Sequence, residues 1–233
     1  MSEVSKYSYL VGNLFFLLIW LILFFRTKYF KHQLLVISIF AIPLGPLSEL
    51  MYRIDYWRPE LITGNIVGIE DMLFAFCIAG IGFGLYKIIF NLKYSNQKTK
   101  AYPILAFILV ILTIIGMIIN SVFSWMNSIY FSSLCFLIGA LIIFILRKDL
   151  IKLALINGAL VAALMFIFYF TFLIPLYPKV FETTWLLKNI SQIFIFGVPI
   201  EELLWGFSWG ILAGCIYEFY KGYKFLESFE TIE

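Results

Sequence analysis

The stretch GVPIEELLWGFSWGILAGCIYEFY, residues 197–220, is almost entirely apolar, yet it places two glutamates side by side near its start. About 20 apolar helical residues cross the hydrocarbon core of a bilayer, so this stretch is long enough to form a transmembrane helix. Pro199 suits the first turn of such a helix. Glu201 and Glu202 are therefore expected near one membrane surface, at the start of a spanning helix.

The whole chain has a composition similar to that of this stretch. Of its 233 residues, 63% are hydrophobic and 13% are charged, and the mean hydropathy is +0.98. A soluble domain could not cover its surface with such a composition. The sequence predicts an all-α integral membrane protein with about seven transmembrane helices. We place them at residues 8–25, 33–50, 65–91, 102–119, 128–146, 150–174 and 191–220.

The positive residues are distributed unequally between the two sides of these helices. Eleven lie in the loops on one side, and five lie on the other, namely Lys6, Arg53, Arg58, Lys179 and Lys188. Lys and Arg accumulate on the cytoplasmic side of membrane proteins. The sequence therefore predicts a multi-pass protein of the cell inner membrane, with its N-terminus outside and its C-terminus in the cytoplasm. The small net charge of +3 does not indicate a nucleic-acid partner.

Two motifs occur twice in the chain. Residues 42–46, IPLGP, recur as IPLYP at 174–178, and residues 68–76, GIEDMLFAF, align with PIEELLWGF at 199–207. Repeated motifs at a constant offset are typical of duplicated membrane proteins. We expect two parallel three-helix repeats, residues 1–91 and 128–220, joined by a linking helix at 102–119 and followed by a cytoplasmic tail at 221–233.

The repeat offset also aligns two residues of opposite charge. Lys87 and Glu218 occupy equivalent positions on the third and the last helix, at the same expected depth. Opposite charges placed together offset each other's desolvation. We therefore expect the two side chains to lie within ion-pair distance across the pseudo-twofold axis, unless each extends separately to the headgroups.

The acidic doublets Glu70-Asp71 and Glu201-Glu202 occupy equivalent positions in the two repeats. An ionised side chain at a helix centre costs at least about 2.5 kcal/mol, so four carboxyls here need a reason. One reason is structural, since acidic residues interact favourably with a helix start. The other is chemical. Adjacent helical residues are about 100° apart, so one member of each doublet can face the interior, where two carboxyls could serve as acid and base.

Aromatic residues follow both doublets. Trp205 and Trp209 follow Glu201 at i+4 and i+8, and Phe74 follows Glu70 at i+4. They either face lipid or form a cavity wall whose rings could stabilise a cation. In the helix expected at 65–91, Gly80, Gly82 and Gly84 indicate close helix packing.

The sequence does not favour a metal site or a disulfide framework. The three cysteines fall in separate apolar segments without C-x-x-C spacing, and the single histidine, His32, lies in a basic loop. Residues 201–206, EELLWG, also resemble the Glu-Glu-x-x-x-Arg motif of intramembrane proteases. Those proteases need an arginine where Gly206 stands, and further histidines on other helices. That class is therefore excluded.

Residues 199–202, PIEE, preceded by Gly197 and followed by an aromatic-rich helix, resemble the Pro-x-Glu-Glu motif of the membrane-embedded, non-flavin lycopene cyclase family. Members of that family have two related halves, and the resemblance extends from about Gln33 to Tyr220. The first half departs from the pattern, because GIED at 68–71 replaces Pro-x-Glu-Glu. The chain is therefore similar to a divergent member.

The resemblance implies a carotenoid cyclase that closes a ring at the end of a linear polyene without cofactor, metal or net oxidation. It implies catalytic roles for Glu201, Glu202, Glu70 and Asp71, and a substrate wall made by Phe74, Phe76, Trp205, Phe207 and Trp209. The expected partners are a lipophilic isoprenoid substrate and the bilayer, and a homodimer is left open. The competing hypothesis is a small repeat-built transporter or a lipid-binding membrane protein that uses the same carboxyls.

Overall fold

The computed structural model describes residues 7–226, and nearly all of the regular structure is helical. The long helices are α1 (Ser8–Arg26), α4 (Ile69–Ile89), α5 (Pro103–Phe123), α6 (Ser128–Leu146), α7 (Ile151–Ile167) and α10 (Ile200–Lys221). Shorter helices are α2 (Lys31–Ala41), α3 (Leu44–Asp55), α8 (Ile174–Leu176) and α9 (Val180–Thr184). Two small antiparallel sheets pair β1 (Tyr94–Lys98) with β4 (Tyr223–Phe225) and β2 (Phe194–Ile195) with β3 (Val198–Pro199).

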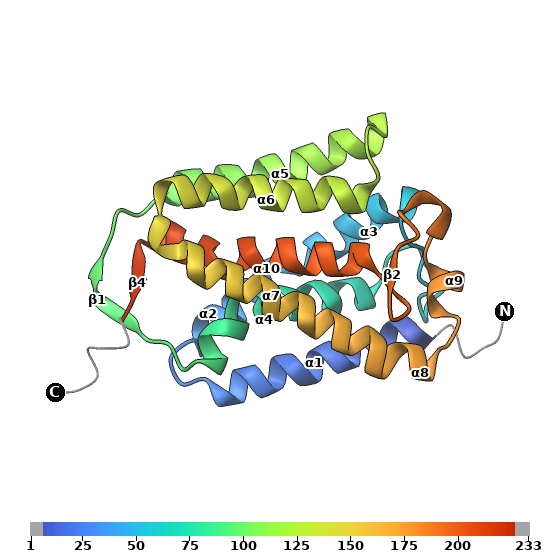
Figure 1. Ribbon diagram of the computed structural model, residues 1–233, viewed down its shortest axis with the longest axis horizontal. Coiled ribbons are helices and arrows are strands. Elements are labelled where there is room, and N and C mark those ends of the chain that lie inside the picture. Colours follow the sequence, from blue (N-terminus) through green and yellow to red (C-terminus); the bar gives the residue numbers. More distant parts are fainter. Residues whose placement is uncertain (1–6, 227–233) are drawn as a thin grey trace.

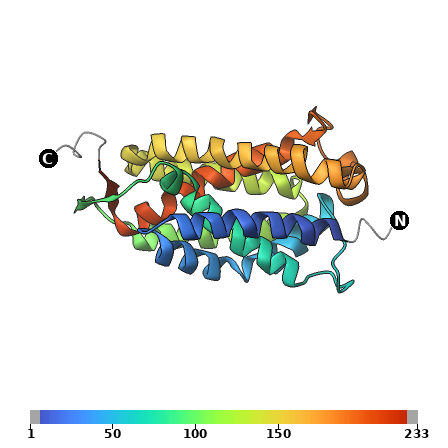
Figure 2. The ribbon, with the colours of Figure 1, turned by 90° about the horizontal axis from the view of Figure 1, so that it is seen from below.

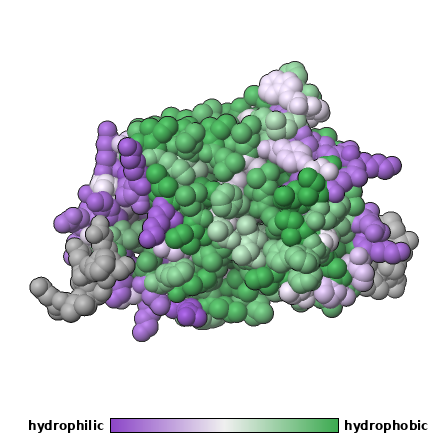
Figure 3. All heavy atoms as spheres, in the orientation of Figure 1, coloured by the Kyte–Doolittle hydropathy of each residue, from purple (hydrophilic) through white to green (hydrophobic). Residues whose placement is uncertain are grey.

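Five helical segments in this part of the chain are long and apolar enough to cross a membrane, and a sixth is obtained if α2 and α3 count as one span. The helices run side by side, with the start of α1 and the strand β4 at opposite ends of the bundle (Figures 1 and 2). In the face shown in Figure 3, a broad hydrophobic band separates hydrophilic residues gathered at the two ends. This distribution is the one expected of an integral membrane protein.

Three of the expected helices differ from the structure. The single helix expected at 33–50 is broken between α2 and α3, which meet at a bend of 50°. Pro43 lies at the break, and proline has no N–H to continue the helical hydrogen bonds. The helix expected from 65 begins at Ile69, and the one expected from 191 begins at Ile200, since the β2–β3 hairpin occupies residues 194–199.

A second irregularity lies near the repeated proline motif. α7 passes into a π-helical segment at Phe168–Leu173 before the short α8, which contains Pro175. The expected helix at 150–174 is therefore present, with a widened last part. Such π segments often occur at functional sites.

Helices α4 and α10 form the centre of the bundle. α4 contacts α1, α2, α3, α7 and α10, while α10 also packs on α6 and α7. Close packing at glycines is confirmed on α4. A Cβ on Gly80 would lie 2.3 Å from Trp20 Nε1, and one on Gly82 would lie 2.8 Å from Trp209 Nε1.

The expected ion pair between the central helices is confirmed. Lys87 Nζ on α4 lies 3.0 Å from Glu218 Oε1 on α10, and both side chains are fully buried. The Tyr94 hydroxyl donates a hydrogen bond of 2.6 Å to the same carboxylate oxygen. Burial and the neighbouring Glu218 carboxylate raise the pKa of Tyr94 above its ordinary value. Lys87 and Glu218, which the repeat offset aligns, thus contact each other between the two central helices.

Candidate functional site

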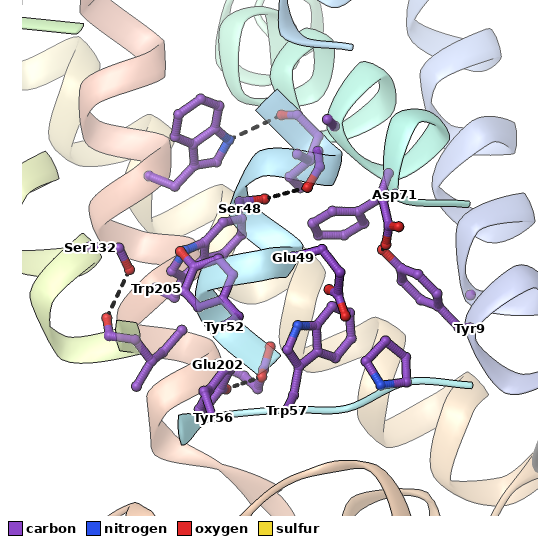
Figure 4. Close-up of a pocket in the computed structure, with 18 of the residues that line it drawn as sticks. Tyr9, Ser48, Glu49, Tyr52, Tyr56, Trp57, Asp71, Ser132, Glu202 and Trp205 are labelled. Atoms are coloured by element: carbon purple, nitrogen blue, oxygen red, sulfur yellow. Dashed lines mark hydrogen bonds between the residues drawn. The ribbon is translucent and has the colours of Figure 1, made fainter. Parts of the chain in front are cut away.

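A cavity of about 200 Å³ lies inside the bundle, near the starts of α4 and α10 (Figure 4). Side chains from α1, α3, α4, α5, α6 and α10 line it, together with residues of the π-helical segment and of α9. Most of the lining is apolar or aromatic. Among the described residues, the acidic lining consists of Glu49, Asp71 and Glu202, and the lining contains no Lys, Arg or His.

The two acidic doublets have the same orientation relative to the cavity. Asp71 and Glu202, the second member of each doublet, line the cavity. Glu70 and Glu201 turn instead towards the segments that precede their helices: Glu70 Oε1 accepts a 2.8 Å hydrogen bond from Ile62 N, and Glu201 Oε1 accepts one of 2.9 Å from Ser191 N. The 100° between adjacent helical residues explains this division.

Glu202 is held by three neutral donors. The hydroxyl of Tyr56 donates to Oε1, the hydroxyl of Tyr169 donates to Oε2 at 2.5 Å, and Trp185 Nε1 donates to Oε1 at 2.7 Å. Tyr56 follows α3, Tyr169 lies in the π-helical segment and Trp185 follows α9, so three separate parts of the chain meet at this carboxyl. Hydrogen bonds from several directions fix its orientation towards the cavity.

Asp71 has fewer partners. It accepts a hydrogen bond of 3.0 Å from the hydroxyl of Tyr9, on α1, and one of 2.7 Å from Gly68 N. In the second half, Tyr130 near the start of α6 donates a 2.5 Å hydrogen bond to Glu201. The first helix of each half thus contributes a tyrosine to the acidic doublet of its own half, although the two tyrosines bind opposite members of the doublets.

Glu49 was not anticipated from the sequence. Its side chain on α3 is 2% exposed and lines the cavity. Arg53, one turn later, forms an ion pair with it at 3.2 Å, and Asp71 lines the same cavity. Spacing could have revealed it, because Glu49, Tyr52 and Tyr56 follow one another at intervals of three and four and so share one helix face.

Three of the predicted aromatic residues line the cavity. Trp205 stacks between Phe74 and Trp209, with ring centroids 6.2 Å from each. Trp205 Nε1 also donates to the hydroxyl of Tyr52 at 2.9 Å. The predicted stripe that started at Glu201 is off by one position, because the cavity-facing series is Glu202, Trp205 and Trp209, at i, i+3 and i+7.

Phe76 and Phe207, expected in the same wall, are absent from the cavity lining. Phe76 packs against Trp20 with ring centroids 4.7 Å apart, and Phe207 packs against α7 at Gly158. Each lies two residues beyond a cavity-facing aromatic, which corresponds to about 200° around the helix. These two positions correct the predicted substrate wall.

The lycopene cyclase family model matches residues 127–220, which run from the residue before α6 almost to the end of α10. This part of the chain is similar to the lycopene cyclase family. The predicted resemblance is thereby confirmed over the second repeat, which contains Glu201, Glu202, Trp205 and Trp209. No curated protein and no solved structure matches the chain.

The first half of the site lies outside the segment matched by the lycopene cyclase family. It contributes Asp71, Phe74 and Glu49 to the same cavity that receives Glu202. Within residues 7–226, no group of three or more His, Cys, Asp and Glu side chains is arranged to hold a metal ion. The arrangement supports chemistry by carboxyl groups in an apolar, aromatic cavity.

Proposed function

We propose that this protein is a carotenoid cyclase, an isomerase-type enzyme that closes a ring at the end of a linear polyene within the membrane. One observation carries the proposal. Asp71 and Glu202, which occupy equivalent positions of the two central helices, face a single cavity whose wall is mostly apolar and aromatic. The match of residues 127–220 to the lycopene cyclase family model supports it.

The proposed reaction needs one proton donor and one proton acceptor. A protonated carboxyl delivers H⁺ to the terminal double bond of the polyene, and a nearby internal double bond attacks the resulting carbocation to close the ring. A carboxylate then removes a proton from a ring carbon, and the electrons of that C–H bond form the new double bond. One proton enters and one leaves, so the product is an isomer of the substrate and no redox cofactor is needed.

The environments of the carboxyls suggest their roles. Glu202 accepts three hydrogen bonds, which suits a carboxylate that receives the proton. Asp71 and Glu49 line the same mostly apolar cavity, where two ionised carboxyls repel each other, and a proton held by one of them removes this repulsion. We therefore assign Glu202 as the base and the Asp71–Glu49 pair as the acid.

The aromatic wall serves the cationic intermediate. The ring faces of Phe74, Trp205 and Trp209 can stabilise a carbocation electrostatically. The mainly apolar lining excludes water, which would otherwise capture the cation. Glu70 and Glu201 position the segments before α4 and α10 through their hydrogen bonds to backbone N–H groups, without touching the substrate.

The membrane arrangement forms part of the proposal. Five helical segments are candidate spans, and α2–α3 together form a sixth. α10 has 22 residues, is about 33 Å long and is taken as the seventh. The seven crossings then form two parallel three-helix repeats joined by α5. Eleven of the seventeen positive residues lie in segments 26–31, 93–100, 147–152 and 221–224, at the end of the bundle that carries β1 and β4 (Figure 1). This distribution supports a cytoplasmic C-terminus and an outer N-terminus.

Expression of the protein in a host that accumulates lycopene tests the proposal. Pigments extracted from the cells are separated by chromatography and compared with those of a host that produces the Glu202→Gln variant at the same level. We expect cyclised pigment from the wild-type protein and little or none from the variant. A host that retains only linear pigment, although the protein is present in its membranes, would contradict the proposal.

A further inference from the structure

An apolar cleft with a volume of about 320 Å³ lies beside the acidic cavity. Ala79 and Trp209 line both, so the cleft and the cavity share part of their floor on α4 and α10. The cleft itself is lined by apolar and aromatic side chains, and its rim residues Phe40 and Phe107 are 77% and 66% exposed. In a membrane, such exposed rims would face the lipid.

The helices on the two sides of the cleft also line the cavity. On α5, Ala106 and Val110 line the cleft, and Thr113 and Met117 line the cavity. Met117 lies eleven positions after Ala106, which corresponds to about 16 Å along the helix. One face of α5 therefore borders both spaces along about half of its length.

The opposite side of the cleft is formed by α2, which also leads to the cavity. Ile37 and Phe40 of α2 line the cleft, while Ala41 and Leu44, at the bend between α2 and α3, line the cavity. The break at Pro43 thus lies where the cleft becomes the cavity. The linking helix α5 belongs to neither repeat, and this position gives it a function besides joining them.

We infer that this cleft, between α2 and α5, holds the linear chain of the polyene while its reacting end lies among the carboxyls. The inference rests on the proposed function, because ring closure acts on the end of a long molecule and the rest must lie outside the acidic cavity. A straight apolar chain entering sideways from the bilayer matches the lining, the exposed rims and the continuity with the cavity. A lipid acyl chain has similar chemistry, and the test distinguishes the polyene from it as the occupant of the cleft.

The test narrows the cleft from each side. Val110→Trp on α5 and Ile37→Trp on α2 place a large ring in the cleft, while Leu112→Trp is the matched control. Leu112 is 58% exposed and lines neither space. Each protein is purified in detergent and given either a full-length linear polyene or a short acyclic terpene with the same end group. Retained pigment is measured by its absorbance and cyclisation by chromatography.

We expect both cleft variants to lose at least tenfold in affinity for the long polyene and in kcat/KM with it, and to cyclise the short terpene within about twofold of wild type. The control should match wild type with both compounds. Unchanged binding and turnover of the long polyene in both cleft variants would overturn the inference and leave the cleft to lipid. Wild-type protein that retains the polyene without cyclising it would contradict the proposed function alone, and the loss of retention in the cleft variants would still support the binding site.

Discussion

The neighbouring glutamates Glu201 and Glu202 allow a direct comparison of the two explanations for the acidic doublets. Both side chains are at most 5% exposed, both lie in the first turn of α10, and both accept short hydrogen bonds. Only Glu202 lines the cavity. Substitution of each by glutamine therefore makes the same chemical change at two adjacent positions, of which one faces the proposed substrate.

We expect Glu202→Gln to fold and insert normally. The amide oxygen can still accept hydrogen bonds, and the hydroxyl of Tyr169 can rotate to accept one from the amide nitrogen. The amide cannot take up a proton as a carboxylate does, so cyclisation should fall by about 10² to 10⁴. This range corresponds to about 2.7 to 5.4 kcal/mol in the activation barrier, at 1.36 kcal/mol for each factor of ten.

Glu201→Gln should behave differently. Its oxygen keeps the hydrogen bonds from Ser191 N and the Tyr130 hydroxyl, and we expect a loss of about 1 kcal/mol in stability with activity within about threefold of wild type. Asp71→Asn and Glu70→Gln repeat the comparison on α4, where Asp71 lines the cavity and Glu70 does not.

The assay is the initial rate of conversion of linear to cyclic pigment in isolated membranes, normalised to the amount of protein by immunoblot. Thermal denaturation in detergent monitors folding. An equal loss of activity in Glu201→Gln and Glu202→Gln, with both proteins folded, would refute the assignment of the cavity-facing carboxyl. Loss confined to the second half would show that the GIED copy at 68–71 is structural.

Three further predictions concern the scaffold. Lys87→Met should cost about 3 to 5 kcal/mol in stability, because it leaves Glu218 buried without its ion-pair partner. Adding Glu218→Leu should restore most of this stability, as measured by thermal denaturation in detergent. Equal stability of the single variant and wild type would contradict the prediction. Reporter fusions placed after Lys100 and at the C-terminus should both report cytoplasm, and a periplasmic signal from either would overturn the topology. Gly45→Ala should lower both pigment turnover and melting temperature, because its Cβ would lie 2.1 Å from a backbone carbonyl oxygen of α4. In Gly116→Ala the nearest contact of the Cβ is 3.4 Å away. This variant should keep pigment turnover within about twofold of wild type and leave the melting temperature unchanged.

The sequence by itself determined the class of protein. An apolar composition can be accommodated only by spanning helices, so their approximate places follow from length and hydropathy, whereas the structure has five or six candidate spans where seven were predicted. The repeated motifs had a further consequence. The offset between Lys87 and Glu218 predicted a contact between residues 131 positions apart, because equivalent positions of parallel repeats lie at the same depth.

Only the tertiary structure decided which member of each doublet faces the cavity. The sequence places Glu201 and Glu202 next to each other, but the rotation of α10 depends on its packing against α4, α6 and α7. A change of about 100° in that rotation exchanges the two carboxyls and moves the aromatic stripe with them. Glu49 was missed for a related reason. With Arg53 one turn away it has the spacing of an exposed helical ion pair, whereas in the structure its side chain is buried and lines the cavity together with Asp71.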